Sequence, residues 1–151
     1  MNREAPDEAP VALDDGRVAE LETGARSEIE KVLDPAEVES SWDHDELLDR
    51  ILEAAGGAGL LDERLLAATG VVLGRRLARV CKLEWVEDPA EGELGVRLPG
   101  TTVLFYPRRM VSSQLELARQ QGRLQALRLA WLVASTRDYL KSLVRFHPTQ
   151  G

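Results

Sequence analysis

The residues of this chain best suited to binding chemistry are the basic side chains of its last third. Residues 106–151 carry eight of them against two acidic ones. A guanidinium group binds carboxylate or phosphate through two parallel hydrogen bonds. We expect five of these residues to contact an acidic partner: Arg108, Arg109, Arg119, Arg123 and Lys141. Arg128 lies inside an apolar run, so we expect it to pair with an internal carboxylate instead.

Few residues could support catalysis or bind a metal ion. His44 stands between two aspartates, but adjacent side chains on a helix point apart, which favours a surface or capping role. His147 precedes a proline near the C-terminus, and Cys81, the single cysteine, ends an apolar stripe where packing is the favoured role. A zinc site needs three or four ligands at workable spacing, which this set does not supply. We therefore predict no catalytic residue, no metal and no cofactor, and expect a protein that is not an enzyme.

Three other polar or glycine-rich segments also favour structural roles. The segment 43–49 carries four acidic residues but lacks the spacing and glycine of a calcium-binding loop, which favours a solvated face. Gly56–Gly59 follows a predicted helix and lacks the Lys–Ser/Thr pair of a phosphate-binding loop, so it is typical of a linker. Ser112 and Ser113 stand at a predicted helix start, where capping or exposure is expected.

Charge is unevenly divided along the chain. The net charge is −7, yet residues 1–63 sum to −14 and residues 64–151 to +7. The two halves could neutralise each other within one fold, which is the interpretation we favour. Alternatively, the basic half could meet an acidic partner, with the acidic N-terminus as an internal competitor. The pI of about 4.9 lies below that expected of a dedicated nucleic-acid-binding domain.

Length and composition indicate one globular domain. The 151 residues suffice for a single core, and 44% hydrophobic with 30% charged residues is ordinary for such a domain. Uncharged runs such as 129–136, and the longest ones, 65–74 and 98–107, are far shorter than the roughly 20 residues that cross a bilayer. The acidic, proline-containing N-terminus does not resemble a secretory signal. We therefore expect no membrane association and a location in the reducing cytoplasm.

The middle of the chain predicts a small antiparallel meander. Three segments have the composition or the alternation of strands, with β-branched, aromatic or alternating apolar residues: 83–86, 94–98 and 101–106. Turn residues separate them, and Pro107 cannot donate to a ladder, so it should end the last strand. We predict three strands within 83–106.

Helical patterns flank this meander on both sides in sequence. We predict an unordered acidic arm over residues 1–16, whose few large apolar residues cannot offset the entropy of ordering. A single domain over 17–147 should follow, with N-terminal helices in 17–55 and a core region in 62–146. Asp34 and Asp43 stand where helix N-caps are expected. Gly122 should break the C-terminal helical region in two.

The fold predicted is therefore α+β, with the meander packed on helices 62–82 and 123–146. Gly70 and Gly74 are spaced so that a neighbouring element can approach the first of these helices closely. Eight residues are expected in the core: Leu73, Leu77, Trp85, Val96, Val103, Phe105, Leu127 and Trp131.

Three short segments resemble one uncharacterised bacterial family, the domain of unknown function numbered 3806. They are the helix-to-strand passage VVLGRRLARVCKLEW, the turn VRLPG at 96–100 and the strand-to-helix exit TTVLFYPRRMVSSQLE. The resemblance spans roughly residues 69–143. It implies a small α+β module of unknown role and supplies no catalytic residues.

Two hypotheses of function follow from these features. The favoured one is a non-enzymatic cytoplasmic module that recognises a protein partner through its meander or its basic helical surface. The alternative is binding of nucleic acid or another polyanion through the same basic surface, which would make affinity fall steeply with salt. We also expect the acidic arm to mask that surface in part.

Overall fold

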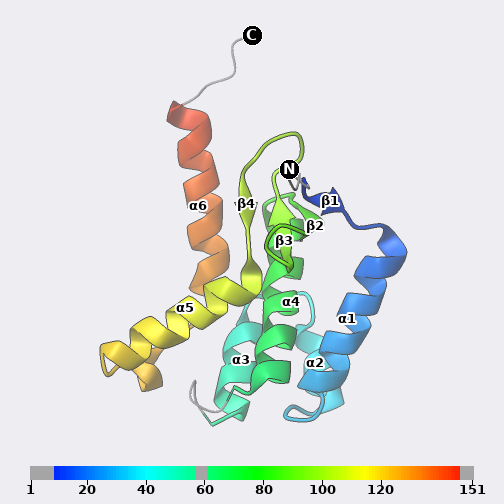
Figure 1. Cartoon of the computed structure of the whole chain (residues 1–151). Helices are drawn as coiled ribbons and strands as arrows, with labels where there is room; N and C mark the ends of the chain where they lie inside the picture. The colour runs from blue at the N-terminus through cyan, green and yellow to red at the C-terminus, as the bar shows by residue number, and fades with distance from the viewer. Residues whose placement is uncertain (1–8, 57–60, 147–151) are drawn as a thin grey trace, which may run out of the picture.

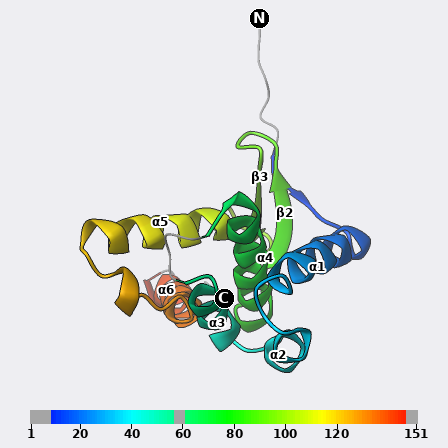
Figure 2. The same ribbon diagram turned by 90° about the horizontal axis from the view of Figure 1, so that it is seen from below.

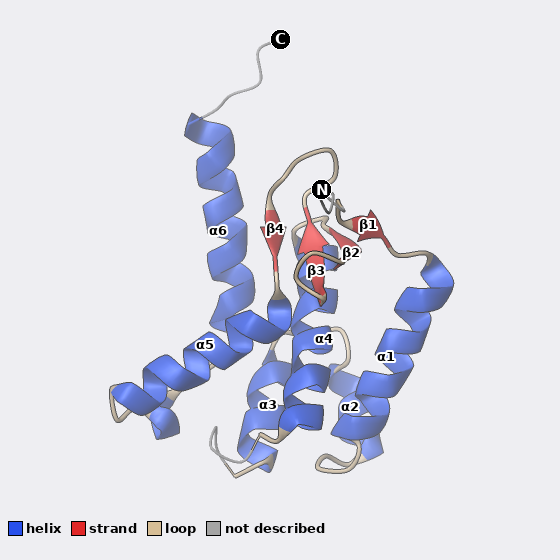
Figure 3. Cartoon of the chain, viewed as in Figure 1, coloured by secondary structure: helices blue, strands red, loops and turns tan. Residues whose placement is uncertain are grey.

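The computed structural model describes residues 9–56 and 61–146, which form an α+β fold (Figures 1 and 3). The helices are α1 (Asp15–Ile29), α2 (Pro35–Ser41), α3 (Glu46–Ala54), α4 (Glu63–Val80), α5 (Pro107–Gln120) and α6 (Trp131–Phe146), with a 3₁₀ turn, η2 (Leu124–Ala126). The strands are β1 (Val11–Ala12), β2 (Glu84–Asp88), β3 (Glu93–Arg97) and β4 (Leu104–Phe105). The predicted break at Gly122 is confirmed, since α5 ends at Gln120 and Gly122 has a φ of +66°.

The sheet has four antiparallel strands in the order β1-β2-β3-β4, one more than predicted. The additional strand comes from the segment expected to be unordered: Val11 pairs with Glu87 and Ala12 with Val86. The Leu13 N–H also donates to the Trp85 carbonyl, at 3.0 Å. Residues 9–16 are thus part of the fold, whereas residues 1–8, and the question of masking, lie outside the described residues.

One of the two predicted aspartate caps is confirmed. Asp34 accepts from the Ala36 N–H at 2.8 Å. Asp43 is not a cap, because its carboxylate binds arginines of α4 and α3 begins three residues later. Two caps were not predicted: Asp14 caps α1 by accepting from the Arg17 N–H, and Asp62 caps α4 by accepting from the Leu65 N–H, each at 2.8 Å.

Helix α4 lies at the centre of the molecule. In both views α1 lies on one side of it, and α5 and α6 lie on the other (Figures 1 and 2). Leu73 and Leu77, which the apolar period placed in the core, are fully buried. The core also extends into the N-terminal helices, where Ile29, Val38, Leu47, Leu48 and Ile51 are fully buried.

The two glycines of α4 are sites of close approach, as their spacing predicted. A Cβ on Gly74 would lie 2.3 Å from the Trp85 ring, and one on Gly70 would lie 2.9 Å from the Arg108 backbone. Trp85 and the first turn of α5 therefore pack directly on the α4 backbone. This contact joins the sheet and α5 to the central helix.

The predicted core is partly right. Leu73, Leu77, Trp85 and Val96 are buried, whereas Val103, Phe105 and Leu127 are half-buried. The prediction that Trp131 belongs to the core is wrong, because 46% of its surface is exposed. The C-terminal helical region has two apolar stripes, and the inward one carries Leu129, Leu132 and Val133.

Candidate interaction surface

The five basic residues predicted to bind a partner do not form one site. Arg108 and Arg109 lie in the first turn of α5, and Arg119 lies near its end. A helix rises about 1.5 Å per residue, so roughly 15 Å of α5 separates Arg109 from Arg119. Arg123 follows the helix, and Lys141 is on α6. The structure therefore divides the predicted surface into separate regions.

Arg108 and Arg109 are neutralised by the turn between β2 and β3. Arg108 lies 3.3 Å from Glu93, and Arg109 lies 2.8 Å from Glu91 and 3.5 Å from Glu93. The Arg109 guanidinium also lies over the Tyr106 ring, 4.5 Å from its centroid. These contacts attach the turn to the start of α5. Arg108 and Arg109 therefore carry less uncompensated positive charge than the sequence indicated.

Tyr106 and Asp88 strengthen the same junction. The Tyr106 hydroxyl donates to the Asp88 carboxylate at 2.6 Å, and the Ala90 N–H donates to that carboxylate at 3.1 Å. Asp88 is buried, so this hydrogen bond satisfies a carboxylate withdrawn from water. The bond to Asp88, followed by burial, raises the pKa of Tyr106 to about 12. The phenol therefore stays protonated as a donor at physiological pH.

Three arginines in the second half of α4 are neutralised by acids of the N-terminal half. Arg75 lies 2.6 Å from Asp43 and 3.3 Å from Glu22, and Arg79 lies 2.9 Å from Asp43. Arg76 lies 2.7 Å from Asp45. Hydrogen bonding to Arg75 lowers the pKa of Asp43. The favoured interpretation of the divided charge is thus supported here, since acids from 1–63 bind arginines from 64–151.

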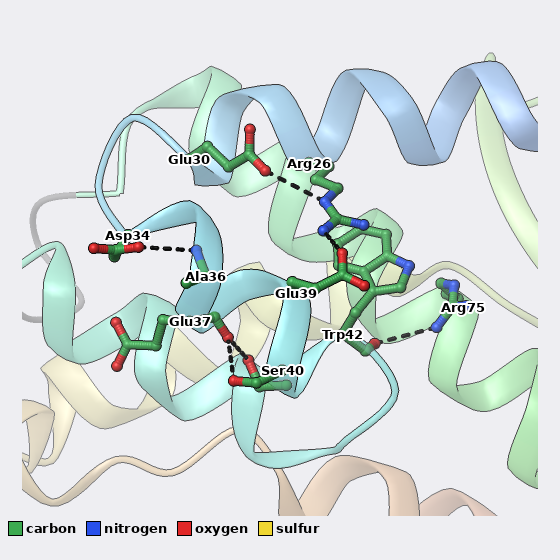
Figure 4. A network of polar contacts seen from close by, with 10 residues as sticks. Arg26, Glu30, Asp34, Ala36, Glu37, Glu39, Ser40, Trp42 and Arg75 are labelled. Atoms are coloured by element: carbon green, nitrogen blue, oxygen red, sulfur yellow. Dashed lines mark hydrogen bonds and ion pairs between the residues drawn. The ribbon is translucent and has the colours of Figure 1, made fainter.

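Trp42 is the part of this network that sequence reasoning missed. The Arg26 and Arg75 guanidinium groups lie over its ring, 5.1 and 5.2 Å from the centroid, and Arg75 donates to its carbonyl at 3.1 Å (Figure 4). Arg26 is itself held by Glu30, at 3.3 Å, and by Glu39. The available signal was an aromatic residue directly before an acidic cluster. The network is typical of structural cross-linking between helices.

The end of α5, η2 and the start of α6 form a region that we call the α5–α6 corner. Its surroundings differ from those of the paired arginines described above. It contains a hollow of about 300 Å³. Its lining residues are Gln114, Leu117, Ala118, Gln121, Arg123, Ala126, Leu127, Arg128 and Trp131. None of them is acidic, and two large apolar side chains stay exposed: Leu117 at 45% and Trp131 at 46%.

The cations of the α5–α6 corner are also less compensated. Arg123 contacts the Gln121 side chain at 3.4 Å, and Arg128 donates to the Leu127 carbonyl at 2.9 Å. The expected pairing of Arg128 with an internal carboxylate is therefore wrong: its side chain is exposed, and neither arginine forms an ion pair with a carboxylate in the described ranges. Arg119 has a surface pair with Glu116, at 2.7 Å.

The corner is held in position by Asp49 of α3. Its carboxylate accepts from the backbone N–H groups of Leu129, in a short contact, and Ala130, at 3.2 Å. This fixes the entry into α6 and turns Leu129, Leu132 and Val133 inward. Trp131 consequently points outward, which explains why the apolar pattern alone misplaced it.

The remaining candidates have exposed or structural positions. His44, Ser112 and Ser113 are exposed, and His147 lies outside the described residues. Cys81 is half-buried as a free thiol, and burial raises its pKa. In the described ranges, no cluster of three or more histidine, cysteine or acidic residues could hold a metal ion. No described helix is both long and apolar enough to cross a bilayer.

Comparison with known proteins gives one result. The family described as "Domain of unknown function (DUF3806)" matches residues 45–125, more than half of the chain. The chain therefore belongs to this family, in agreement with the resemblance of its central segments. The matched region begins before α3 and ends within η2. Searches of curated proteins and of solved structures find no match.

Proposed function

We propose that this protein is a non-enzymatic module that binds a protein partner through the α5–α6 corner. The observation that carries the proposal is the exposure of Trp131 and Leu117 beside Arg123 and Arg128. Tryptophan and arginine are enriched among the residues that dominate binding energy at protein interfaces. A hollow between them can receive one apolar side chain of a partner.

The charge of this surface indicates the chemistry of the partner. Arg123 and Arg128 are not balanced by acidic residues of the hollow, so an acidic segment would supply the missing carboxylates. A segment that combines acidic residues with one large apolar anchor would satisfy both properties. The cytoplasm is the proposed location, because the single cysteine remains a free thiol.

Nucleic acid is the second candidate, because an exposed tryptophan beside arginines could also stack on unpaired bases. Two observations weigh against it. The net charge is −7, and Arg75, Arg76 and Arg79 of α4 and the two arginines at the start of α5 are already paired with carboxylates. Few cations therefore remain for phosphate contacts, which supply most of the affinity of nonspecific binders.

A comparative pull-down tests the proposal. The wild type, Trp131→Ala and Arg123→Glu would be used to capture proteins from native lysate and identify them by mass spectrometry. Arg17→Glu is the matched control, because it makes the same charge change at an exposed position of α1, away from the corner. We expect a partner captured by the wild type and the control to be lost by both corner variants.

The contrary outcomes are also defined. Equal capture of every partner by all four proteins would refute the corner as the binding surface. Retention of labelled single-stranded DNA or RNA that falls steeply with salt, and is lost in Trp131→Ala, would favour the polyanion alternative.

A further inference from the structure

A second and larger hollow lies on the other face of the molecule. It has a volume of about 590 Å³ and lies between α1 and α4, with the turn before β3 and the start of α5 also in its wall. Figure 1 places α1 on the opposite side of α4 from the α5–α6 corner. The two hollows therefore belong to different surfaces, and a partner of one would not cover the other.

Most of the lining of this α1–α4 groove is apolar and small. Leu21 and Ala25 of α1 face Ala68 and Val71 of α4, and Leu94 of β3 joins them. Small side chains leave a shallow floor between the two helices. A shallow apolar trough between packed helices accepts a third helix by the same ridge-and-groove geometry that packs helices in domains.

Gly24 adds evidence that something packs closely against α1. It stands in the interior of that helix, where glycine is less favourable than alanine. A Cβ at Gly24 would meet nothing within 4 Å, unlike those at Gly70 and Gly74, which are excluded by neighbouring elements. Packing within the chain therefore does not require this glycine. Its place on the groove wall instead allows an occupant to approach the helix backbone.

The charges of the rim indicate the polarity of the occupant. Glu20 and Glu28 both line the α1 side. They are eight residues apart, which corresponds to roughly 12 Å along the helix. Glu20 forms no ion pair in the described ranges, and Glu28 has one surface pair, with Lys31 at 3.1 Å. The α1 edge of the groove is therefore acidic, and it can bind two cations that lie about two helical turns apart.

We propose that the α1–α4 groove binds an amphipathic helix of a protein partner, with its apolar stripe on the floor and basic residues along the α1 edge. Two lysines or arginines seven or eight residues apart on that helix would reach Glu20 and Glu28. Arg64, on the α4 side of the groove, favours an acidic residue at the corresponding edge of the partner. This site is independent of the α5–α6 corner.

A synthetic helical peptide serves as the probe. It has about four turns, a leucine and alanine stripe, and two lysines seven residues apart; a matched peptide carries glutamates at the two lysine positions. Binding to the full chain is followed by NMR of labelled methyl groups. We expect the lysine peptide to shift the Leu21, Val71 and Leu94 methyl signals and to leave those of Leu117 and Leu127 unchanged. The glutamate peptide should bind at least about tenfold more weakly.

Variants at two glycines of the same helix complete the test. Gly24→Leu should reduce peptide affinity at least about tenfold, whereas Gly24→Ala should raise the unfolding midpoint and still weaken binding. Gly16→Ala is the control: Gly16 is on α1 but does not line the groove, so binding should be unchanged.

Three results would overturn this proposal. These are the absence of methyl shifts at millimolar peptide, equal binding of the two peptides, or unchanged binding by Gly24→Leu. A concentration-dependent dimer of the chain alone that Gly24→Leu abolishes would also overturn it, since the occupant would then be a second copy.

Discussion

The arginines of α4 and those of the α5–α6 corner come from the same basic half of the sequence but have opposite environments. Arg75 and Arg76 have side chains that are 12% and 15% exposed and are bound to carboxylates from the N-terminal half. Arg123 and Arg128 are exposed and have no carboxylate partner in the described ranges. Arginines of the same formal charge therefore cross-link helices in α4, whereas those at the corner remain available as binding groups.

This difference shows why a count of basic residues overestimates a binding surface. Helix α1 and the segment directly before α3 lie against α4, so Arg75 and Arg76 meet acids supplied by the fold itself. In Figure 2, α5 extends from α4 on the side opposite α1 and α2, away from most of those acids. Asp49 of α3 does reach the corner, but its carboxylate accepts from the backbone N–H groups of Leu129 and Ala130, directly before α6.

The largest contrast is expected between two tryptophans. Trp85→Ala should reduce the free energy of unfolding by about 3–5 kcal/mol, because the ring is 7% exposed and fills the space left by Gly74. Trp131→Ala should cost less than about 1 kcal/mol, since nearly half of that side chain is in solvent. Urea unfolding followed by circular dichroism measures both. Similar losses in the two variants would mean that Trp131 belongs to the core.

The next largest difference in stability is expected between variants of Arg75 and Arg123. Arg75→Ala should cost about 2–3 kcal/mol, because it removes the stacking on Trp42, leaves Glu22 without its cation and leaves Asp43 with Arg79 alone. Arg123→Ala should change stability by less than about 0.5 kcal/mol. The same unfolding assay distinguishes them. A large loss from Arg123→Ala would show that the corner cations are structural as well.

A smaller difference in stability is expected between alanine variants of Gly74 in α4 and Gly24 in α1. Gly74→Ala should destabilise the protein by about 1–3 kcal/mol although alanine favours helix, because the new methyl group would overlap the Trp85 ring. Gly24→Ala should instead stabilise it by about 0.5–1 kcal/mol, since nothing occupies that space. Thermal unfolding midpoints that move in opposite directions would confirm the contrast. A stabilising Gly74→Ala would mean that Trp85 can move aside.

The sequence predicted the features that depend on local periodicity. Each of these depends on a few neighbouring residues: the stripe that includes Leu73 and Leu77, the aspartate cap at residue 34, and the break at Gly122. The β1 strand escaped prediction, because two residues are too short to show alternation and their partner strand lies more than seventy residues away.

The proposed binding surface was less predictable for the same reason. Nothing local indicates that Arg75 meets Asp43, or that Arg123 meets no acid, because those pairings follow from tertiary packing. The two apolar stripes of α6 were both plausible core faces. The contact of Asp49 with the start of that helix settles the choice, and it joins residues eighty positions apart.

The smallest effect is expected at the junction of Tyr106 and Asp88, and only in alkaline solution. The hydrogen bond to Asp88 raises the folded-state pKa of Tyr106 from 10.0 to about 12. A raised pKa means that folding favours the protonated phenol. Its contribution is therefore complete below pH 10 and is lost as the pH rises from 10 towards 12. At neutral pH, this ionisation should leave stability independent of pH.

A background without the second tyrosine makes this measurable. The chain has two tyrosines, so Tyr139→Phe leaves Tyr106 as the only source of tyrosinate absorbance. We expect that absorbance to appear with a midpoint near 12 in the folded protein. Adding Tyr106→Phe should remove the alkaline step and the part of the stability loss that accompanies it. A midpoint at the ordinary value of 10 would mean that the hydrogen bond to Asp88 is not maintained in solution, and the turn before β3 would then be free of α5.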